Sequence, residues 1–214
     1  MKLIDRPLYL RQLEGLINTP DIKIITGIRR SGKSKLLSGF SEHILKTDAS
    51  ANIISIDLTK IKFEHLKDYH ALNDYIEANY REGVNNYLMI DEVQLCPNFE
   101  ITINSLHSEE KYDIYLTGSN AFLLSSDLAT LFTGRYMEIH VYPFSFREYC
   151  SYFEVEKDFD EHFDRYIRLG GLAGSYRYKN DTDKEKYIRD VYDTILIRDL
   201  VQKYKLGNAT LLKK

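Results

Sequence analysis

A glycine-rich segment near the N-terminus has the residue types and spacing to bind phosphate. Residues 27–34 read GIRRSGKS and match the pattern G-x-x-x-x-G-K-[ST]. Gly27 and Gly32 let the backbone turn so that several N–H groups converge on one anion. Lys33 supplies a flexible positive charge for the β- and γ-phosphates, and Ser34 offers a hydroxyl oxygen to Mg²⁺. The segment therefore predicts a phosphate-binding loop.

The segments on either side of this loop support the prediction. Residues 22–28 are apolar and β-branched, which predicts a buried strand, and residues 33–46 place apolar side chains on one helical stripe. A phosphate loop needs this strand–loop–helix order, because the helix N-terminus adds a partial positive charge. Arg29 and Arg30 either add charge near the phosphates or point to solvent. The residues expected around the nucleotide are Gly27, Ile28, Arg29, Arg30, Ser31, Gly32, Lys33, Ser34 and Lys35.

Two adjacent carboxylates follow a second apolar segment. Asp91 and Glu92 come near the end of the predicted strand 86–94, and ligands of open α/β sheets bind at the carboxyl ends of the strands. This arrangement is a Walker B pattern. We expect Asp91 to hold Mg²⁺, directly or through a water, and Glu92 to orient or deprotonate the attacking water. A water-activating Glu favours hydrolysis over transfer of the phosphate to a second substrate.

Two further segments contain polar residues with a candidate role. The letters TGSN end the predicted strand 112–118, and either Ser119 or Asn120 is expected to contact the γ-phosphate or the attacking water. The alternative is an ordinary turn. Arg135 comes just before the predicted strand 136–142. It is either a finger that stabilises charge on the nucleotide of a neighbouring subunit, which would require a homo-oligomer, or a surface residue.

The elements that must position these residues alternate along the chain. The predicted strands are 22–28, 52–59, 86–94, 112–118 and 136–142, and the predicted helical segments between them are 33–46, 63–82, which is one or two helices, and 98–110. Such alternation indicates βαβ units and a parallel sheet that is covered on both faces. After residue 149 the strands stop, and residues 155–178 and 184–205 predict helices. We expect an α/β core over residues 1–150 and a helical segment over residues 151–214.

Composition limits the classes of function. Of the 214 residues, 43% are hydrophobic and 29% charged, as in an ordinary globular protein, and the net charge of −3 argues against a broadly basic nucleic-acid binder. No apolar run approaches the roughly 20 residues of a membrane helix, and the N-terminus lacks the apolar stretch of a signal peptide. The 2 cysteines fit a reducing compartment, and the 6 histidines show no metal-ligand spacing. These features predict a cytoplasmic protein without a membrane partner.

The order of the segments resembles that of a known family. The segments are GIRRSGKS, LMIDE, LTGSN, LFTGR and YPFSFREY, followed by IRLGGLAGSY and YIRDVYDTILIRDLVQKY. Together they resemble the AAA-type ATPases of bacteria and archaea that carry a C-terminal restriction-nuclease-like domain. The resemblance covers nearly the whole chain and is to the N-terminal ATPase part of those proteins.

The resemblance implies several properties that periodicity and spacing do not. The core is expected to be a three-layer P-loop NTPase with a five-stranded parallel sheet in the order 5-1-4-3-2, and the ligands to be ATP and Mg²⁺. Ser119 becomes the favoured sensor, and Arg6 and Tyr9 lie where similar proteins build part of the base pocket. Residues 151–214 are expected to form a helical lid or connector that runs into an incomplete winged helix. DNA would be a partner only through C-terminal regions that this chain lacks.

These inferences favour an Mg²⁺-dependent ATPase in which hydrolysis drives a rearrangement between the core and the C-terminal helices. The alternative is a slow nucleotide-dependent switch with negligible turnover, which the same motifs would serve. A kinase acting on a small molecule is disfavoured. The sequence shows neither a segment that would form an acceptor pocket nor a lid segment with arginines that have an evident role.

Overall fold

The computed structural model describes residues 6–118 and 130–195, which form two compact units. We call the unit made of Pro7–Thr26 and Lys33–His140 the sheet unit. The helical unit contains Arg6, Gly27–Gly32 and residues 141–195. The glycine-rich loop therefore belongs to the helical unit, although the chain continues from both of its ends into the sheet unit.

The sheet unit is built on five parallel strands. They are β1 (Ile22–Thr26), β2 (Asn52–Asp57), β3 (Asn86–Asp91), β4 (Asp113–Thr117) and β5 (Tyr136–His140), in the order β2-β3-β4-β1-β5. This order confirms the expected P-loop NTPase core. β1 and β3 end before the predicted boundaries, because Gly27 and Glu92 leave the extended backbone with φ angles of +144° and +56°.

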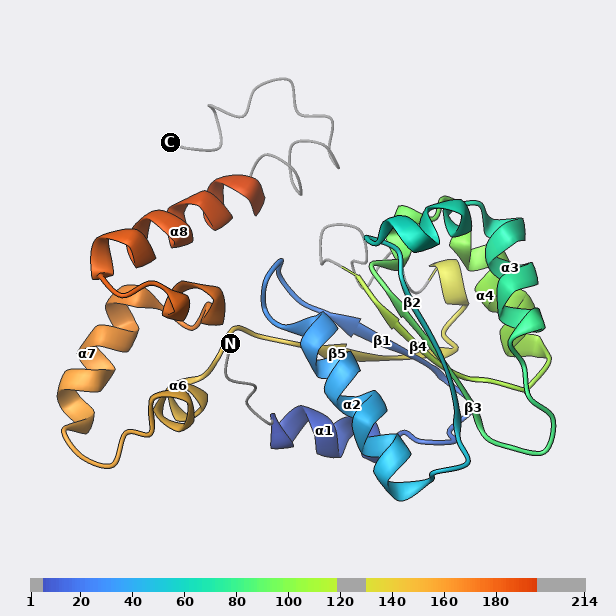
Figure 1. Ribbon diagram of the computed structural model, residues 1–214, viewed down its shortest axis with the longest axis horizontal. Coiled ribbons are helices and arrows are strands. Elements are labelled where there is room, and N and C mark those ends of the chain that lie inside the picture. Colours follow the sequence, from blue (N-terminus) through green and yellow to red (C-terminus); the bar gives the residue numbers. More distant parts are fainter. Residues whose placement is uncertain (1–5, 119–129, 196–214) are drawn as a thin grey trace. The chain divides into compact units, whose positions relative to one another are not determined.

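Helices cover both faces of the sheet. Figure 1 shows α1 (Pro7–Glu14) and α2 (Lys33–Thr47) on one face, and α3 (Tyr69–Ala78) and α4 (Phe99–Ser108) on the other. The sheet unit also contains the short helices η1 (Ile61–Lys67) and η2 (Val93–Leu95). The predicted helical segment 63–82 is two helices, because the Asp68 side chain accepts hydrogen bonds from the N–H groups of His70 and Ala71 and so starts α3.

The core follows the alternation of side chains along the strands. On the α3–α4 face, Ile24, Ile90 and Leu116 pack with Leu72 and Ile103, and all five are fully buried. Burying such a side chain contributes about 1.5–3 kcal/mol relative to leaving it in water. On the opposite face, the rings of Phe40 in α2 and Tyr115 in β4 lie 5.1 Å apart. Two packed faces hold the strands, and with them the strand ends that carry the predicted chemistry.

The helical unit contains α6 (Phe146–Phe153), α7 (Phe159–Leu169), η3 (Ala173–Arg177) and α8 (Asp181–Thr194). Phe144, Tyr149 and Tyr176 form its aromatic core. α6 was not predicted from the sequence, although Ser145 and Glu148 form a capping box at its start. Residue 150, the predicted domain boundary, lies inside α6. Residues 196–214, which include the predicted start of a winged helix, lie outside the described residues.

Candidate nucleotide-binding site

The glycine-rich loop has a backbone that only glycine tolerates at two positions. Gly27 and Gly32 have φ angles of +144° and +102°, where L-residues are rarely found. A Cβ atom on Gly27 would lie 2.2 Å from the carbonyl oxygen of Val141, within the helical unit. The loop backbone therefore lies against the backbone of Val141 and leaves no room for a side chain at position 27.

A buried hydroxyl in this loop fits a phosphate ligand. Ser31 is 2% exposed, and its Oγ atom has no hydrogen-bond partner within residues 6–118 and 130–195. A Cβ atom on Gly27 would lie 2.9 Å from this oxygen, so the hydroxyl lies close to the Gly27 backbone. An unpaired buried polar group costs about 1–3 kcal/mol, and a phosphate oxygen that accepted this hydroxyl would remove the cost.

The two arginines of the loop differ in their surroundings. The Arg30 guanidinium donates to the hydroxyl of Tyr187 in α8 at 3.0 Å and lies 5.2 Å from the centre of that ring. Arg30 also has a φ of +67°, which is uncommon for a residue with a side chain. In the structure Arg30 is thus tied to α8, whereas Arg29 is half-buried.

The residues expected to hold Mg²⁺ meet in the sheet unit. α2 begins at Lys33, which is 4% exposed, and Ser34 follows it. The Ser34 hydroxyl hydrogen-bonds the Asp91 carboxylate at the end of β3. A hydroxyl and a carboxylate from neighbouring elements are oxygen donors of the kind that Mg²⁺ takes beside the phosphates of a nucleotide. This donor set therefore fits the metal.

Asp91 is 8% exposed, and its surroundings change the pKa of its carboxyl group. Burial raises the pKa of Asp91, the hydrogen bonds from Thr117 and Ser34 lower it, and the nearby charges of Glu92 and Asp57 raise it. The net shift is upward. A bound divalent metal would stabilise the charged form of a buried carboxylate such as this one.

Thr117 is a site residue to which the sequence analysis assigned no role. Its hydroxyl donates to Asp91 and accepts a hydrogen bond from the N–H of Glu92 at 3.0 Å. The register of β3 and β4 pairs Ile90 with Leu116, so the next residues along both strands are neighbours. The order of the strands, once known, would have revealed this contact.

Glu92 has an unusual backbone and a restrained side chain. Its φ and ψ are +56° and +49°, in the left-handed region, and strained residues of this kind cluster at functional sites. Its carboxylate accepts a hydrogen bond of 2.5 Å from the Gln94 side-chain amide. Gln94 Oε1 is buried without a hydrogen-bond partner among the described residues. Gln94 is a second residue that the motif analysis missed.

Three further candidates, Ser119, Asn120 and Arg135, are either outside the described residues or distant from Asp91 and Glu92. Ser119 and Asn120 are outside the described residues, which resume at residue 130. Arg135 is exposed, and its guanidinium donates to the Thr133 hydroxyl at 3.1 Å and 3.2 Å. Its carbonyl accepts from the N–H of Ile22, so Arg135 lies at the start of β1. The five residues of β1, at about 3.3 Å each, separate it from the end of that strand.

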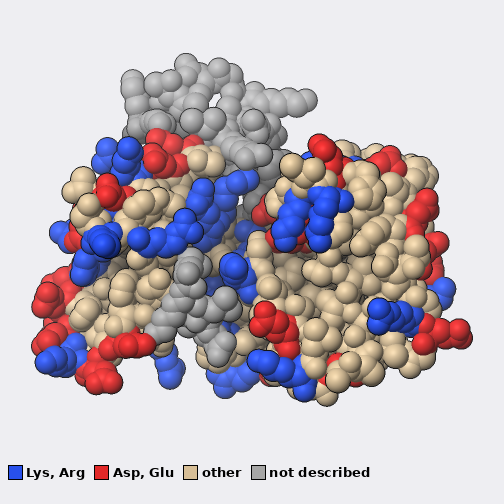
Figure 2. Space-filling model, viewed as in Figure 1, with Lys and Arg blue, Asp and Glu red and all other residues tan. Residues whose placement is uncertain are grey.

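The surface charge, the metal-ligand pattern and the helix lengths of the described residues complete the description. Figure 2 shows both signs of charge on the visible face of each unit. Within the described ranges, no group of three or more His, Cys, Asp or Glu residues is arranged to hold a metal by itself. None of the helices in those ranges has the length and apolar character needed to cross a bilayer.

Comparison with known proteins places this geometry in context. Residues 19–150 match the family described as the AAA domain. An uncharacterised protein of Haemophilus influenzae is 32% identical, with 99% of this chain and 54% of that protein covered. The chain spans about half the length of the curated relatives it matches.

Two solved structures share the fold. AMPPCP-bound DnaA from Aquifex aeolicus has a TM-score of 0.54 at 18% identity, covering 97% of this chain and 73% of that chain. The Saccharomyces cerevisiae Hsp104–ADP complex has a TM-score of 0.54 at 18% identity, covering 72% of this chain and 24% of that chain. Identities this low establish the fold alone.

Proposed function

The chain belongs to the AAA domain family, and from this premise we propose that it binds ATP with Mg²⁺ and hydrolyses it. One observation carries the proposal. The Ser34 hydroxyl, one residue into the helix that follows the loop, is hydrogen-bonded to Asp91, and the next residue in the chain is Glu92. In this proposal, two consecutive residues, the last of β3 and the one after it, supply the ligand of the metal and the partner of the water.

Each residue has a defined part in this proposal. The N–H groups of the loop and the Ser31 hydroxyl bind the phosphates, and Lys33 offsets their negative charge. Asp91 and Ser34 hold Mg²⁺, which when bound supplies charge neutralisation at the β- and γ-phosphates. Glu92 orients the attacking water and accepts its proton. Most of the rate enhancement then comes from positioning and electrostatics, with little covalent chemistry by the protein.

A bound nucleotide could also act on the helical unit, because the glycine-rich loop is part of that unit. Gly27–Gly32 is part of the helical unit, and Arg30 in this loop donates to the Tyr187 hydroxyl in α8. We propose that the nucleotide state alters the conformation of the helical unit. Arg135 lies at the start of β1, whereas the loop follows the end of that strand, so a role as a finger requires a second subunit.

Phosphate release by the purified chain tests this function. We expect release with MgATP, less with ATP and EDTA, and less with MgGTP. Turnover below about 10⁻³ per second, near that of an unassisted switch GTPase, would support the slow switch instead of the ATPase. Equal release with EDTA present would contradict the assignment of a metal to Asp91 and Ser34.

A further inference from the structure

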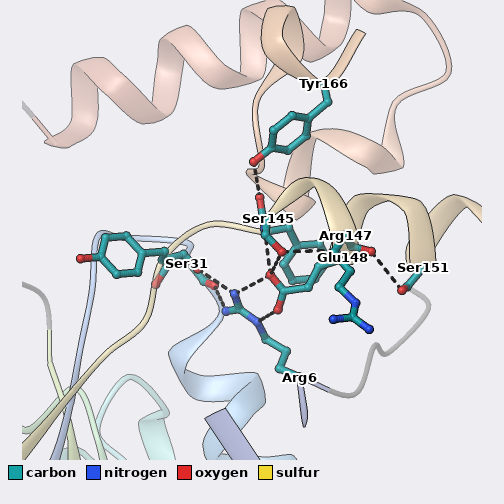
Figure 3. Close-up of polar contacts among 9 residues, drawn as sticks. Arg6, Ser31, Ser145, Arg147, Glu148, Ser151 and Tyr166 are labelled. Atoms are coloured by element: carbon teal, nitrogen blue, oxygen red, sulfur yellow. Dashed lines mark hydrogen bonds and ion pairs between the residues drawn. The ribbon is translucent and has the colours of Figure 1, made fainter. Parts of the chain in front are cut away.

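Arg6 is a buried arginine, and all three nitrogens of its guanidinium donate hydrogen bonds. Its side chain is 5% exposed and lies between the glycine-rich loop and the start of α6, as Figure 3 shows. Nε donates to Glu148 Oε1 at 2.6 Å and Nη2 to Glu148 Oε2 at 3.1 Å. Nη1 donates to the carbonyl of Ser31 at 3.1 Å, and Nη2 also donates to the carbonyl of Tyr142 at 2.9 Å. The guanidinium therefore joins three separate segments of the helical unit.

Glu148 is in turn fixed by the N-terminus of α6. Its Oε2 atom accepts from the backbone N–H of Ser145 at 2.8 Å and from the Ser145 hydroxyl at 3.0 Å. Burial raises the pKa of Glu148, but the hydrogen bonds from Arg6 and Ser145 outweigh it, so the net shift is downward. The carboxylate is ionised at neutral pH, and it holds Arg6 in one orientation by a bidentate pair.

The contact with Ser31 sets the direction of one peptide group in the loop. The chain contains no cis peptide bond among its described residues, so the peptide between Ser31 and Gly32 is trans. In a planar trans peptide the C=O and the N–H point in opposite directions. Because the Ser31 carbonyl points to Arg6, the Gly32 N–H points away from Arg6. Gly32 has a φ of +102° and can hold this orientation where other residues would be strained.

We propose that the Arg6–Glu148 pair is a positioning device that aims the Gly32 N–H at the phosphates of the nucleotide. This inference rests on the proposed function, because it needs a phosphate to be bound in the loop. Neither side chain touches the nucleotide in this proposal. Glu148 orients Arg6, Arg6 fixes the Ser31 carbonyl, and the peptide plane passes that orientation to the Gly32 amide.

The chemistry of the pair requires arginine at position 6. The guanidinium is a rigid planar fork with five donors, so it can serve a carboxylate and two carbonyls at the same time. A lysine has one terminal nitrogen on a flexible stem and cannot keep all these directions. The Arg6 guanidinium also lies 5.1 Å from the centre of the Phe144 ring, which adds a cation–π contact to its restraints.

The test follows the Gly32 amide itself. The protein is labelled with ¹⁵N-glycine, which marks its 11 glycines, and MgATP is added to the parent, to Arg6→Lys, Arg6→Gln and Glu148→Gln, and to Arg165→Gln as a matched control. Arg165 donates to Asp181 at 2.8 Å within the same unit and has no hydrogen bond to the loop. In the parent and the control, we expect the Gly32 N–H resonance to move downfield. In Arg6→Gln and Glu148→Gln this shift should be lost, and affinity for MgATP should fall by about 10-fold to 100-fold.

The possible outcomes separate the inference from the proposed function. A parent protein that does not bind MgATP overturns the proposed function, and the inference with it. A parent that binds, beside Arg6→Gln and Glu148→Gln variants with an unchanged Gly32 shift and affinity, overturns the inference alone. If Arg6→Gln does not fold, Arg6→Lys and Glu148→Gln carry the test. In the double variant, adding Glu148→Gln to Arg6→Gln should cost no further affinity, because Glu148 acts through Arg6.

Discussion

At the scale of single residues, the site depends on groups that hold one another. Asp91 is hydrogen-bonded by Ser34 and Thr117, and Thr117 also accepts from the Glu92 N–H at 3.0 Å. Gln94 donates to the Glu92 carboxylate at 2.5 Å. The two carboxylates are therefore restrained by different groups, that of Asp91 by hydroxyls and that of Glu92 by an amide. These separate restraints let the two roles be tested separately.

Replacing Glu92 by Gln should keep binding and abolish turnover. The variant Glu92→Gln preserves the shape of the side chain and removes its ability to accept a proton from water. We expect affinity for MgATP within about twofold of the parent and a rate of phosphate release lower by about 10²-fold or more. Calorimetry and a phosphate-release assay measure the two quantities. Hydrolysis at the parent rate would show that the base has been assigned wrongly.

Removing the Gln94 amide should affect the rate and leave affinity unchanged. In Gln94→Leu the Glu92 carboxylate loses its restraint, so fewer bound states hold the water in line with the γ-phosphate. We expect the single-turnover rate to fall by about tenfold while the Kd for MgATP is unchanged. Quench-flow experiments at saturating nucleotide provide the rate. The control is Gln12→Leu, whose residue is exposed in α1. A Gln94→Leu variant with the parent rate would argue against a positioning role.

At the scale of elements, most of the core could be predicted from the sequence. The sequence predicted all five strands and the helices α2 and α4, because short apolar runs alternate with longer amphipathic segments along this part of the chain. α6 was missed because its start is marked by a capping box and not by a long apolar stripe. The motifs predicted Lys33 and Asp91 as site residues, since each follows from a local pattern.

Other parts of the site could not be predicted, because they depend on contacts between distant segments. Thr117 meets Asp91 only through the order of β3 and β4 in the sheet. Arg6 and Glu148 are separated by 142 positions and meet only when the N-terminal segment and α6 have folded. In neither case does a local pattern of residues indicate the partner.

The capping interactions of α6 predict a dependence of stability on pH. The pKa of Glu148 is lowered in the folded protein, so its contribution is present above its ordinary pKa and is lost as pH falls through the lowered value. Urea unfolding of the parent and of Glu148→Gln at pH 7 and at about pH 3 checks this. The difference in free energy of unfolding should be larger at pH 7. An equal difference at both pH values would contradict an ionised Glu148.

At the scale of the whole molecule, a buried ion pair in the sheet unit limits what the fold tolerates. Lys23 in β1 is fully buried, and its ammonium donates to Asp113 in β4 at 2.5 Å and to the Thr19 carbonyl at 2.7 Å. Asp113 also accepts from the Tyr115 hydroxyl and from the Asn18 N–H. The pair joins the starts of two neighbouring strands, whereas the candidate site is built from the ends of the strands.

Removing one partner of this pair should destabilise the protein more than removing both. Lys23→Met leaves the Asp113 carboxylate buried without its cation, which costs about 3–5 kcal/mol. The double variant Lys23→Met/Asp113→Asn removes both charges and should recover part of this loss. Urea unfolding of the three proteins provides the free energies. A single variant as stable as the parent would show that the pair contributes nothing to the fold.

The central claim is that the loop at residues 27–34 binds the phosphates of MgATP, and calorimetric titration tests it most directly. The parent should bind MgATP at a single saturable site. Lys33→Ala should bind about 100-fold more weakly or not at all, because it loses a charge-assisted contact with the phosphates. Lys46→Ala, at the exposed far end of the same helix, should bind as the parent does. A parent without saturable binding, or a Lys33→Ala variant with the affinity of the parent, would contradict the account.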